Sequence, residues 1–294
     1  MNKAWGPARF LKLTGLIGLV VCVALFVGVY FLIGSQINNK ATINRLALRP
    51  AAGKYDGYDQ ELISGIKRES FFIDCPDGSK LHCWFYRVPG AAKVAIVNHG
   101  NAGNLANRMY LAKALTQFSM SVLLYDYRGY GVSSGSPSTD GILQDGLCAF
   151  DYVNKSLKYA PEQIILYGES IGTAVTVYVA SHRPCAGIIL QSPLASLPQV
   201  GRSLLPILWL YPDPVFAEPH LNNIEGIRSV KVPVLILHGE RDEIIPFDHA
   251  KQIFASANEP KTLILLPHCG HNDMGLQDCA LYNSALKSFL GSLK

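Results

Sequence analysis

The chain has 294 residues, of which 49% are hydrophobic and 16% are charged, and its formal net charge at pH 7 is +4. This length suits one α/β domain with a short additional segment, and the seven cysteines include no Cys-x-x-Cys pair, which argues against a zinc ribbon or a redox centre. Several basic residues precede the first acidic residue, Asp56, and the rest of the chain has no Lys/Arg run, so the expected partner of the basic region is anionic lipid, with no nucleic acid.

The first predicted element is the uncharged run over residues 13–34. As an α-helix rising about 1.5 Å per residue, it extends about 33 Å, enough to cross a hydrocarbon core of about 30 Å. A buried core helix is one alternative, although core helices are seldom apolar on every face. A cleaved signal peptide is the other, but the run is long for one and residues 32–36 lack a good cleavage site. We therefore expect an uncleaved signal anchor that makes the protein a single-pass membrane protein.

The segments around the anchor complete the predicted organisation. Residues 1–12 form a basic flank, residues 35–60 have little periodicity and are predicted to be a linker, and residues 61–294 form one domain. Basic residues flank both ends of the anchor, but those on the N-terminal side are denser and closer to it. The positive-inside rule therefore favours an N-terminus in the cytosol and a domain outside it.

The domain begins with two strand-like segments, 71–73 and 81–86, on either side of a Pro-Asp-Gly turn, which predicts a hairpin. Short apolar runs with β-branched members then alternate with helical stretches, a pattern typical of a mostly parallel sheet covered by helices on both faces. With the hairpin as its antiparallel edge, the sheet is predicted to have eight strands. The other strands are expected at 94–98, 122–125, 164–167, 187–191, 232–237 and 262–266, and helices at 105–118, 142–157 and 174–182.

The most informative motif is Gly-Glu-Ser-Ile-Gly at residues 168–172, between a predicted strand and a predicted helix. In this context a Gly-x-Ser-x-Gly sequence indicates a tight turn that projects the serine hydroxyl above the sheet. The glycines allow neighbouring backbone to approach, and the helix N-terminus points free N–H groups at developing negative charge. A Gly-rich turn without chemistry is the alternative. We predict that Ser170 is a nucleophile.

A serine nucleophile needs a base, and the base needs an orienting acid. After such a turn they are expected in the order Ser, Asp or Glu, His. Asp242, on the loop after the penultimate strand, is the predicted acid, whereas Glu240 and Glu243 are interpreted as solvated loop charges. His271, on the loop after the last strand, is the predicted base, with His268 as the alternative.

The predicted oxyanion hole consists of two backbone N–H groups. The first is that of Asn101, in the polar, Gly-containing loop at residues 99–104, and the second is that of Ile171. Such donors stabilise a tetrahedral oxyanion, and the loss of one costs about 2.7–4 kcal/mol. The alternative is an ordinary loop with a capping asparagine, the role that we assign to Asn104.

Together these segments resemble the α/β-hydrolase superfamily and, within it, the Bem-type membrane-anchored serine hydrolases and the related protein depalmitoylases. The resemblance covers about residues 70–290 and places Ser170, Asp242 and His271 at the triad positions. The depalmitoylases carry a lipidated, cysteine-rich N-terminus where this chain has a predicted transmembrane helix. The segments that carry the resemblance are residues 98–104, Asp-Tyr-Arg-Gly-Tyr-Gly-Val-Ser at 126–133, which we interpret as a structural turn, residues 168–173, the Asp242 loop and residues 271–273.

The segment over residues 192–230 is predicted to form a short lid, with an apolar element at 204–212. An apolar lid beside an anchored site favours a lipophilic acyl chain, and a core-packing helix is the alternative. We expect a serine hydrolase that cleaves carboxylic ester or thioester bonds of lipid-like or acylated substrates, through an acyl-enzyme and without cofactor or metal. A serine peptidase and a non-catalytic binding protein are the alternatives. The sequence shows no large specificity domain, which argues against a peptidase. The complete set of predicted catalytic residues argues against a non-catalytic protein.

Two pairs of cysteines are close enough in sequence to form disulfides in an oxidising compartment. These are Cys75 with Cys83 and Cys269 with Cys279. Buried free thiols are the more common interpretation of such scattered cysteines.

Overall fold

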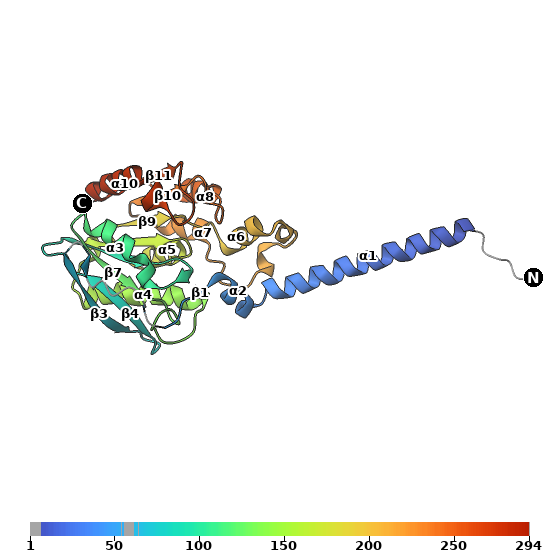
Figure 1. Ribbon diagram of the computed structural model, residues 1–294, viewed down its shortest axis with the longest axis horizontal. Helices are drawn as coiled ribbons and strands as arrows, with labels where there is room; N and C mark the ends of the chain where they lie inside the picture. Colours follow the sequence, from blue (N-terminus) through green and yellow to red (C-terminus); the bar gives the residue numbers. More distant parts are fainter. Residues whose placement is uncertain (1–6, 54, 56–61, 64, 294) are drawn as a thin grey trace, which may run out of the picture.

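The computed structural model describes residues 7–53, 55, 62–63 and 65–293, without the side chains of residues 7–17 and 276. Its centre is a nine-stranded sheet in the order β11-β10-β9-β8-β5-β7-β4-β3-β2 (Figure 1). The strands of this sheet are β2 (Leu62–Ile63), β3 (Ile66–Asp74), β4 (Lys80–Tyr86), β5 (Lys93–Asn98), β7 (Met120–Tyr125), β8 (Ile164–Glu169), β9 (Gly187–Gln191), β10 (Val234–Gly239) and β11 (Lys261–Leu266).

The sheet is mostly parallel, as predicted. Every pairing from β11 to β7 is parallel, and β4, β3 and β2 continue it as an antiparallel edge. Eight of the nine strands correspond to predicted ones. The ninth, β2, pairs its two residues with Ile66 and Lys67 of β3. Two residues are too few to show an alternating pattern, which is why the sequence alone does not reveal this strand.

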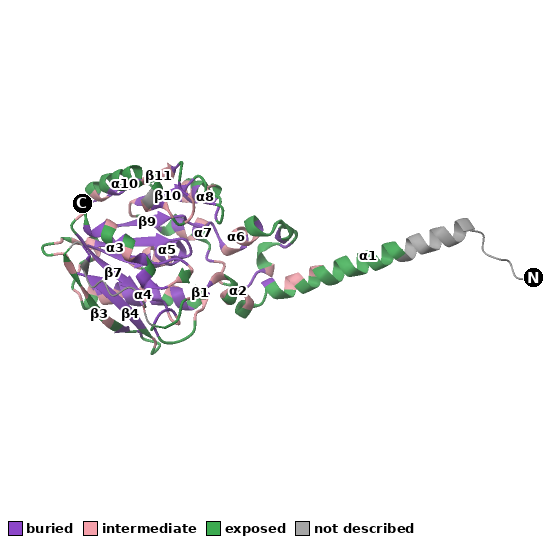
Figure 2. Ribbon diagram, in the orientation of Figure 1, coloured by how far each residue is buried: buried purple, intermediate pink, exposed green. Residues whose placement is uncertain are grey.

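Helices cover both faces of the sheet because alternate residues of a strand point to opposite sides. In β5, Val94 and Ile96 pack into the apolar cluster shared with α4, α5 and α8, whereas Ala95 and Val97 pack into the cluster shared with α3 and α10. Figure 2 shows the sheet as the buried centre of the domain. The bounds of the helices beside the sheet are η1 (Leu105–Arg108), α3 (Met109–Thr116), α4 (Thr139–Lys155), η2 (Pro161–Gln163), α5 (Gly172–His182), α8 (Asp248–Ser256), α9 (Met274–Gln277) and α10 (Cys279–Ser292).

One long helix, α1 (Pro7–Ile37), extends away from the domain (Figure 1). Its segment Gly18–Ile37 has 20 residues and a mean hydropathy of 2.4, so by length and composition it can cross a membrane. The predicted anchor at residues 13–34 lies within α1, and Figure 2 shows the described part of this helix almost entirely exposed. Residues 1–6 of the predicted basic flank lie outside the described residues.

Much of the segment predicted as a linker is folded. Helix α2 (Lys40–Ala47) follows α1, and the Asn39 side chain caps it by accepting a hydrogen bond from the Thr42 N–H at 3.1 Å. Strand β1 (Arg49–Pro50) then pairs in parallel with β6 (Ala102–Gly103) in a separate two-stranded sheet. These elements are too short to produce a periodic pattern, so sequence analysis missed them. Residues 54 and 56–60 of the predicted linker lie outside the described residues.

The predicted lid between β9 and β10 consists of short helices. Two side chains fasten its first part: Arg202 donates a hydrogen bond from Nη2 to the Tyr211 carbonyl oxygen at 2.7 Å, and Nε2 of His249 in α8 lies 3.2 Å from the Ser203 hydroxyl. The lid helices are α6 (Leu197–Leu204), η3 (Pro206–Leu210), η4 (Asp213–Val215), α7 (Asn223–Gly226) and η5 (Ile227–Ser229).

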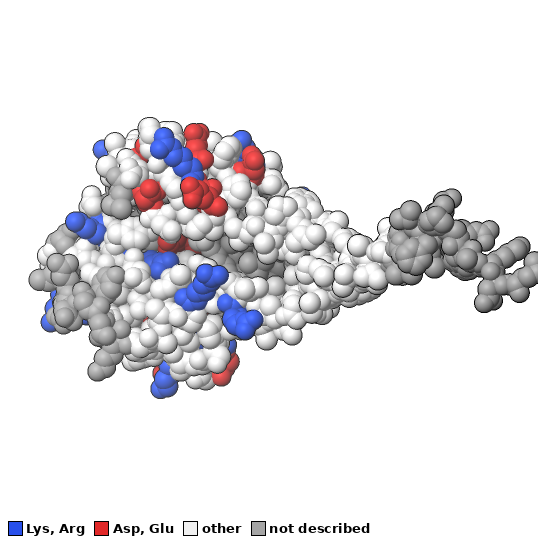
Figure 3. Space-filling model, turned by 45° about the vertical axis from the view of Figure 1, so that its right-hand side comes forward, with Lys and Arg blue, Asp and Glu red and all other residues white. Residues whose placement is uncertain are grey.

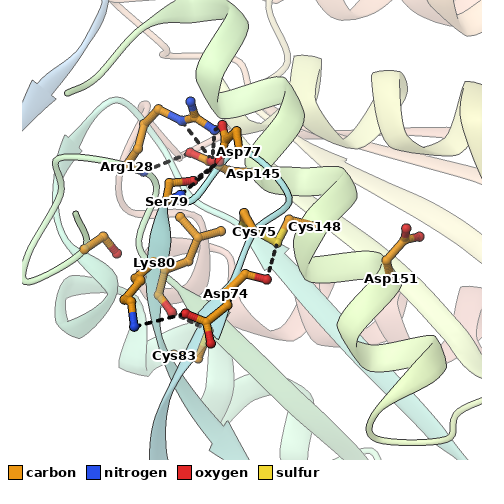
Figure 4. The surroundings of a disulfide bond; sticks show 12 residues. Asp74, Cys75, Asp77, Ser79, Lys80, Cys83, Arg128, Asp145, Cys148 and Asp151 are labelled. Carbon is orange, nitrogen blue, oxygen red and sulfur yellow. Dashed lines mark hydrogen bonds and ion pairs between the residues drawn. A yellow bond between two sulfur atoms is a disulfide. The ribbon is translucent and has the colours of Figure 1, made fainter. Parts of the chain in front are cut away.

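A disulfide joins Cys75, at the end of β3, to Cys148 in α4 (Figure 4). Neither pair considered from the sequence forms, because Cys83, Cys269 and Cys279 are free thiols, and the pairing of Cys75 with Cys148 was not expected. The strand register explains why Cys75 does not pair with Cys83, since Cys83 lies opposite Phe71. Cys75 is four residues further along, about 13 Å at the rise of a strand, whereas a disulfide needs Cα atoms within about 7 Å.

Candidate active site

Ser170 occupies the turn between β8 and α5. Its backbone φ is +54°, in the left-handed region that non-glycine residues rarely adopt. The residue is 8% exposed, and its N–H donates a hydrogen bond to the Gln191 carbonyl oxygen of β9 at 2.9 Å. A strained strand-to-helix turn of this kind directs the serine hydroxyl away from the sheet, at the carboxyl end of its strands.

The two motif glycines are required by close backbone contacts. A Cβ on Gly172 would overlap the carbonyl oxygen of Asn98, the last residue of β5. A Cβ on Gly168 would lie 2.6 Å from the Cα of Thr173. The missing side chains therefore bring the loop after β5 directly against the serine turn, which is the close approach that the motif predicts.

The structure brings the three predicted residues together in the expected order. Nε2 of His271 lies 3.0 Å from the Ser170 hydroxyl oxygen, and Nδ1 lies 2.7 Å from Oδ2 of Asp242. A carboxylate only accepts, so Nδ1 carries the ring proton and Nε2 accepts from the serine hydroxyl. Asp242 and His271 lie on the loops after β10 and β11, and parallel strands bring their carboxyl ends to one edge of the sheet.

Asp242 lies in a polar setting that keeps it ionised. Burial acts to raise its pKa, but hydrogen bonds from His238, His271 and the Ile245 N–H outweigh burial and hold the pKa well below its usual range. Nε2 of His238 lies 3.3 Å from Oδ2, while Oδ1 accepts from the N–H groups of Ile244 and Ile245. Sequence analysis missed His238, which precedes Asp242 by four residues.

The alternative acids and base lie elsewhere. Nδ1 of His268 is 2.9 Å from a carboxylate oxygen of Asp278, and the histidine side chain is 61% exposed. Glu240 and Glu243 are exposed, as expected of solvated loop charges. The structure therefore places His271 and Asp242, and none of these alternatives, beside Ser170.

Both predicted oxyanion donors line the same cleft as Ser170. In the described part of the chain, the N–H groups of Asn101 and Ile171 donate to no protein acceptor, so both are free to meet an external oxygen. The Asn101 carbonyl, in contrast, accepts from the Arg49 N–H and from the Tyr130 hydroxyl, each at 2.8 Å. These contacts fix the peptide group between Asn101 and Ala102, which follows the predicted donor.

A buried ion pair holds the loop of Asn101 in place. Nε of Arg108 lies 2.8 Å from Oε2 of Glu169, the residue that precedes the serine, and its Nη1 donates to the Ala102 carbonyl oxygen. The same Glu169 oxygen accepts from the Gly100 N–H at 3.3 Å. Arg108 and Glu169 thus tie the serine turn to the loop of Asn101. Sequence analysis missed this pair, and nothing in the spacing of the two residues indicates it.

The cleft above Ser170 has a volume of about 430 Å³. Its walls come from α2, the lid and the loop after β10, and within the described residues no group of three or more His, Cys, Asp or Glu side chains is arranged to hold a metal ion. A wall of this composition offers dispersion contacts to a hydrocarbon chain. The apolar residues of the wall are Leu46, Ala47, Ala102, Ile171, Leu194, Leu197, Val200, Leu204, Ile244 and Ile245.

Comparison with known proteins places this geometry in a family. A family model described as serine aminopeptidase S33 matches residues 90–218. An uncharacterized protein of Mycobacterium tuberculosis is 36% identical over 248 residues, which cover 84% of this chain and 86% of the relative. The alpha/beta hydrolase domain-containing protein 17C of Mus musculus is 33% identical over 237 residues, covering 79% of this chain and 70% of the relative.

Solved structures show the same fold. An esterase from Pyrococcus furiosus superposes with a TM-score of 0.69 at 20% identity, over 84% of this chain and 98% of the other. An esterase from Exiguobacterium antarcticum superposes with a TM-score of 0.60 at 18% identity, over 76% of this chain and all of the other. By its sequence relatives, its fold and the strand-to-helix turn that carries Ser170, the chain belongs to the α/β-hydrolase superfamily.

Proposed function

We propose that the protein is a membrane-anchored serine hydrolase that cleaves carboxylic ester or thioester bonds of lipid-like or acylated substrates. The observation that carries this proposal is the pair of hydrogen bonds, 3.0 and 2.7 Å long, that connects Ser170 through His271 to Asp242 in an apolar cleft. A hydroxyl, an imidazole and a carboxylate in this order are the components of nucleophilic acyl transfer.

In the proposed reaction, the Ser170 oxygen attacks the acyl carbon while His271 Nε2 takes the hydroxyl proton. Asp242 stabilises the imidazolium, and the N–H groups of Asn101 and Ile171 bind the oxyanion. The tetrahedral intermediate collapses when Nε2 returns the proton to the leaving alcohol or thiol, which leaves an acyl-enzyme. Water, deprotonated by His271, then releases the carboxylic acid and restores the serine.

The apolar wall of the cleft favours a lipophilic acyl group. Burial of each additional methylene contributes about 0.8 kcal/mol, so turnover at low substrate concentration should rise with chain length until the cleft is full. We expect p-nitrophenyl octanoate to be cleaved with a higher kcat/KM than p-nitrophenyl acetate. The resemblance to protein depalmitoylases extends this expectation to acyl thioesters.

We propose that α1 is the anchor and that the domain lies outside the cytosol. The length and hydropathy of Gly18–Ile37 support the anchor. Two observations favour the non-cytosolic side: the dense basic residues before the anchor, and the disulfide between Cys75 and Cys148, a bond that is typical of oxidising compartments and rare in the cytosol.

The nucleophile is tested with a fluorophosphonate probe on the full chain. The wild type should be labelled and Ser170→Ala should not, and the substitution should lower turnover by about 10⁶-fold if the three residues act as a unit. Ser181→Ala, in the helix α5 that follows the turn of Ser170, is the matched control and should keep both labelling and turnover. Equal labelling of Ser170→Ala and the wild type would refute the assignment and favour a non-catalytic binding protein.

A serine peptidase is the second candidate, favoured by the description of the matching family. An aminopeptidase needs a carboxylate to bind the substrate's α-ammonium group. Glu169 is the only residue with a carboxylate among the described residues that line the cleft, and it is already paired with Arg108. We therefore expect aliphatic p-nitrophenyl esters to be cleaved faster than aminoacyl p-nitroanilides. The reverse preference would favour the peptidase.

A further inference from the structure

We propose that the outer face of the lid, residues 204–210, is a membrane-docking surface that lies in the lipid interface beside α1, so that the cleft receives its acyl chain from the bilayer. This inference rests on the proposed anchor and deepens it, because it assigns a second part of the domain to the same membrane. We call residues 204–210 the lid tip.

The lid tip is unusually apolar for a surface segment. Five of its side chains are large, hydrophobic and about half exposed: Leu204 at 56%, Leu205 at 58%, Ile207 at 46%, Trp209 at 69% and Leu210 at 49%. A contiguous apolar patch of this kind marks an interaction site. A tryptophan beside aliphatic residues is typical of the level of the lipid headgroups.

The lid tip is fixed to the proposed anchor. The rings of Tyr30 in α1 and Tyr211, just after the lid tip, stack with centroids 4.6 Å apart, and the Tyr211 hydroxyl donates to the Tyr30 carbonyl oxygen at 2.7 Å. Leu208 packs in the same apolar cluster with Ile37, and the Ala217 N–H donates to the Ile37 carbonyl oxygen at 2.8 Å. Figure 1 shows this part of the lid beside the base of α1.

These contacts set the depth of the lid tip. Tyr30 precedes the end of the predicted anchor at Gly34 by four residues, so its Cα lies roughly 6 Å inside that end. Gly34 also faces the Tyr211 ring, since a Cβ there would lie 3.3 Å from the ring's Cε1. When α1 spans the bilayer, Tyr211 and the lid tip packed beside it must therefore lie at the level of the interface.

The distribution of charge agrees with this depth. In Figure 3 the surface that joins the domain to α1 is mostly white, and most of the blue and red side chains in this view lie over the rest of the domain. Arg202, the basic residue just before the lid tip, is 8% exposed and turned inward, where its Nη2 pairs with Asp213 at 2.6 Å. The lid tip can thus enter an apolar phase without desolvating an unpaired charge.

The same element reaches the active site. Leu197 and Val200 of α6 line the cleft together with Ser170, and so does Leu204, the first residue of the lid tip. Leu204 contacts the cleft although the residue is 56% exposed, so the apolar wall continues from the serine to the outer surface. An acyl chain can follow this wall from the interface to Ser170 without crossing water.

A second copy of this chain is the other occupant to consider for the lid tip. The bilayer is favoured because the patch is continuous with α1, whose large apolar side chains from Leu19 to Val29 are exposed. A second copy would have to be shaped to fit both the lid tip and α1. A bilayer that surrounds α1 meets the lid tip without any such fit.

The depth of Trp209 can be measured by fluorescence. The chain has three tryptophans, of which Trp84 is only 2% exposed and lies in the core. In the variant Trp5→Phe, Trp209 is therefore the tryptophan that quenchers outside the core can reach. In the full chain reconstituted in vesicles, we expect phospholipids brominated near the top of the acyl chain to quench this emission, and aqueous iodide to quench it weakly. The additional change Trp209→Phe should remove the bromine effect.

Two results would overturn the inference. Strong quenching of Trp209 by iodide and none by brominated lipid would place the lid tip in water. Shielding from both quenchers, together with crosslinking between chains, would assign the patch to a second copy.

A functional test uses the double variant Leu205→Gln and Trp209→Gln, with Leu281→Gln in α10 as the matched exposed apolar control. We expect the double variant to cleave a long-chain ester held in vesicles about tenfold more slowly, and to cleave p-nitrophenyl acetate in solution at the wild-type rate. Leu281→Gln should change neither rate. Equal rates on the vesicle substrate for the double variant and the wild type would refute the docking surface.

The outcomes separate this inference from the proposal it rests on. If the wild type were not labelled by fluorophosphonate at Ser170, the proposed chemistry would be wrong. If alkaline carbonate released the protein from membranes, the proposed anchor would be wrong. If labelling and membrane retention both hold while iodide reaches Trp209, the lid tip alone is assigned wrongly.

Discussion

At the scale of single residues, the structure gives a physical role to the turn at residues 126–133. Asp126 is fully buried, where its Oδ1 accepts from the Leu105 N–H at 2.6 Å and its Oδ2 lies 2.7 Å from the Tyr55 hydroxyl. That hydroxyl is 2.6 Å from Nδ1 of His82, whose Nε2 is 2.8 Å from the Ser70 hydroxyl. Asp126 thus holds the start of η1, next to the loop of Asn101, and a polar chain connects Asp126 to β3 and β4.

Burial favours the neutral forms of Asp126 and His82 in this polar chain. Burial raises the pKa of Asp126 to about 7, although hydrogen bonds from Tyr55 and Leu105 oppose the shift. Burial likewise lowers the pKa of His82 to about 4, with a smaller contribution from Arg68. A protonated Asp126 can donate to the Tyr55 oxygen, while Tyr55 donates to Nδ1 of the neutral His82.

This arrangement predicts a pH dependence of stability. An acid whose pKa is raised by folding contributes stability that is fully present below its ordinary pKa near 4 and is lost as the pH rises through about 7. Asp126→Asn keeps an acceptor for Leu105 and a donor for Tyr55 without the titration. We expect the free energy of unfolding of the wild type to fall by about 1–4 kcal/mol more than that of the variant between about pH 5 and pH 8.

The measurement is urea unfolding of both proteins in one detergent, at the two pH values. Comparing the variant with the wild type cancels the titration of all other groups. Parallel pH profiles for the two proteins would show that Asp126 is ionised in the folded state throughout this range.

At the scale of elements, the disulfide between Cys75 and Cys148 connects the β3–β4 hairpin to α4 across 73 residues. In the chain-entropy account, closing a loop of this length stabilises the folded state by about 4 kcal/mol. Figure 4 shows the bond beside Arg128, which pairs with Asp77 of the hairpin turn at 2.8 Å and with Asp145 of α4 at 2.7 Å. The hairpin is therefore tied to α4 by one covalent and two ionic contacts.

Reduction should therefore lower the thermal stability of the wild type. We expect dithiothreitol to decrease the Tm of the wild type and of Cys279→Ser, an exposed free cysteine that serves as the control. Cys148→Ser should start at the lower Tm and show no response to the reductant. An unchanged Tm of the wild type on reduction, with complete thiol release, would show that the bond contributes no stability.

The elements also show what a sequence can and cannot predict. Strands such as β5 and β8 are apolar throughout, and the serine turn has a fixed local sequence, so these features are visible in short windows. The disulfide, the Arg108–Glu169 pair and the pairing of β1 with β6 join residues more than 50 positions apart. No local pattern encodes such contacts, and they appear only when the sheet brings the segments together.

At the scale of the whole molecule, the proposed anchor is connected directly to the catalytic loop. After α1 and α2, the N–H of Arg49 donates to the Asn101 carbonyl oxygen, and the Ala51 N–H donates to that of Gly103 at 2.9 Å. The segment that follows the proposed anchor therefore positions the loop of Asn101, while the lid contacts the base of α1. Both sides of the cleft are held by residues close to the proposed bilayer surface.

The side of the membrane on which the domain lies can be determined with reporters fused after the C-terminus in a bacterial host. Alkaline phosphatase folds only after export, and cytosolic green fluorescent protein fluoresces only when it is not exported. A domain with an oxidised Cys75–Cys148 bond, behind an anchor with dense basic residues on its N-terminal side, should give an active phosphatase fusion and a dark fluorescent one. Cys148→Ser should leave this pattern unchanged, because the anchor and not the disulfide sets the orientation. A fluorescent fusion with an inactive phosphatase would place the domain in the cytosol. There Cys75 and Cys148 would be reduced thiols, and the hairpin would keep only its noncovalent contacts with α4, which include the ion pairs of Arg128.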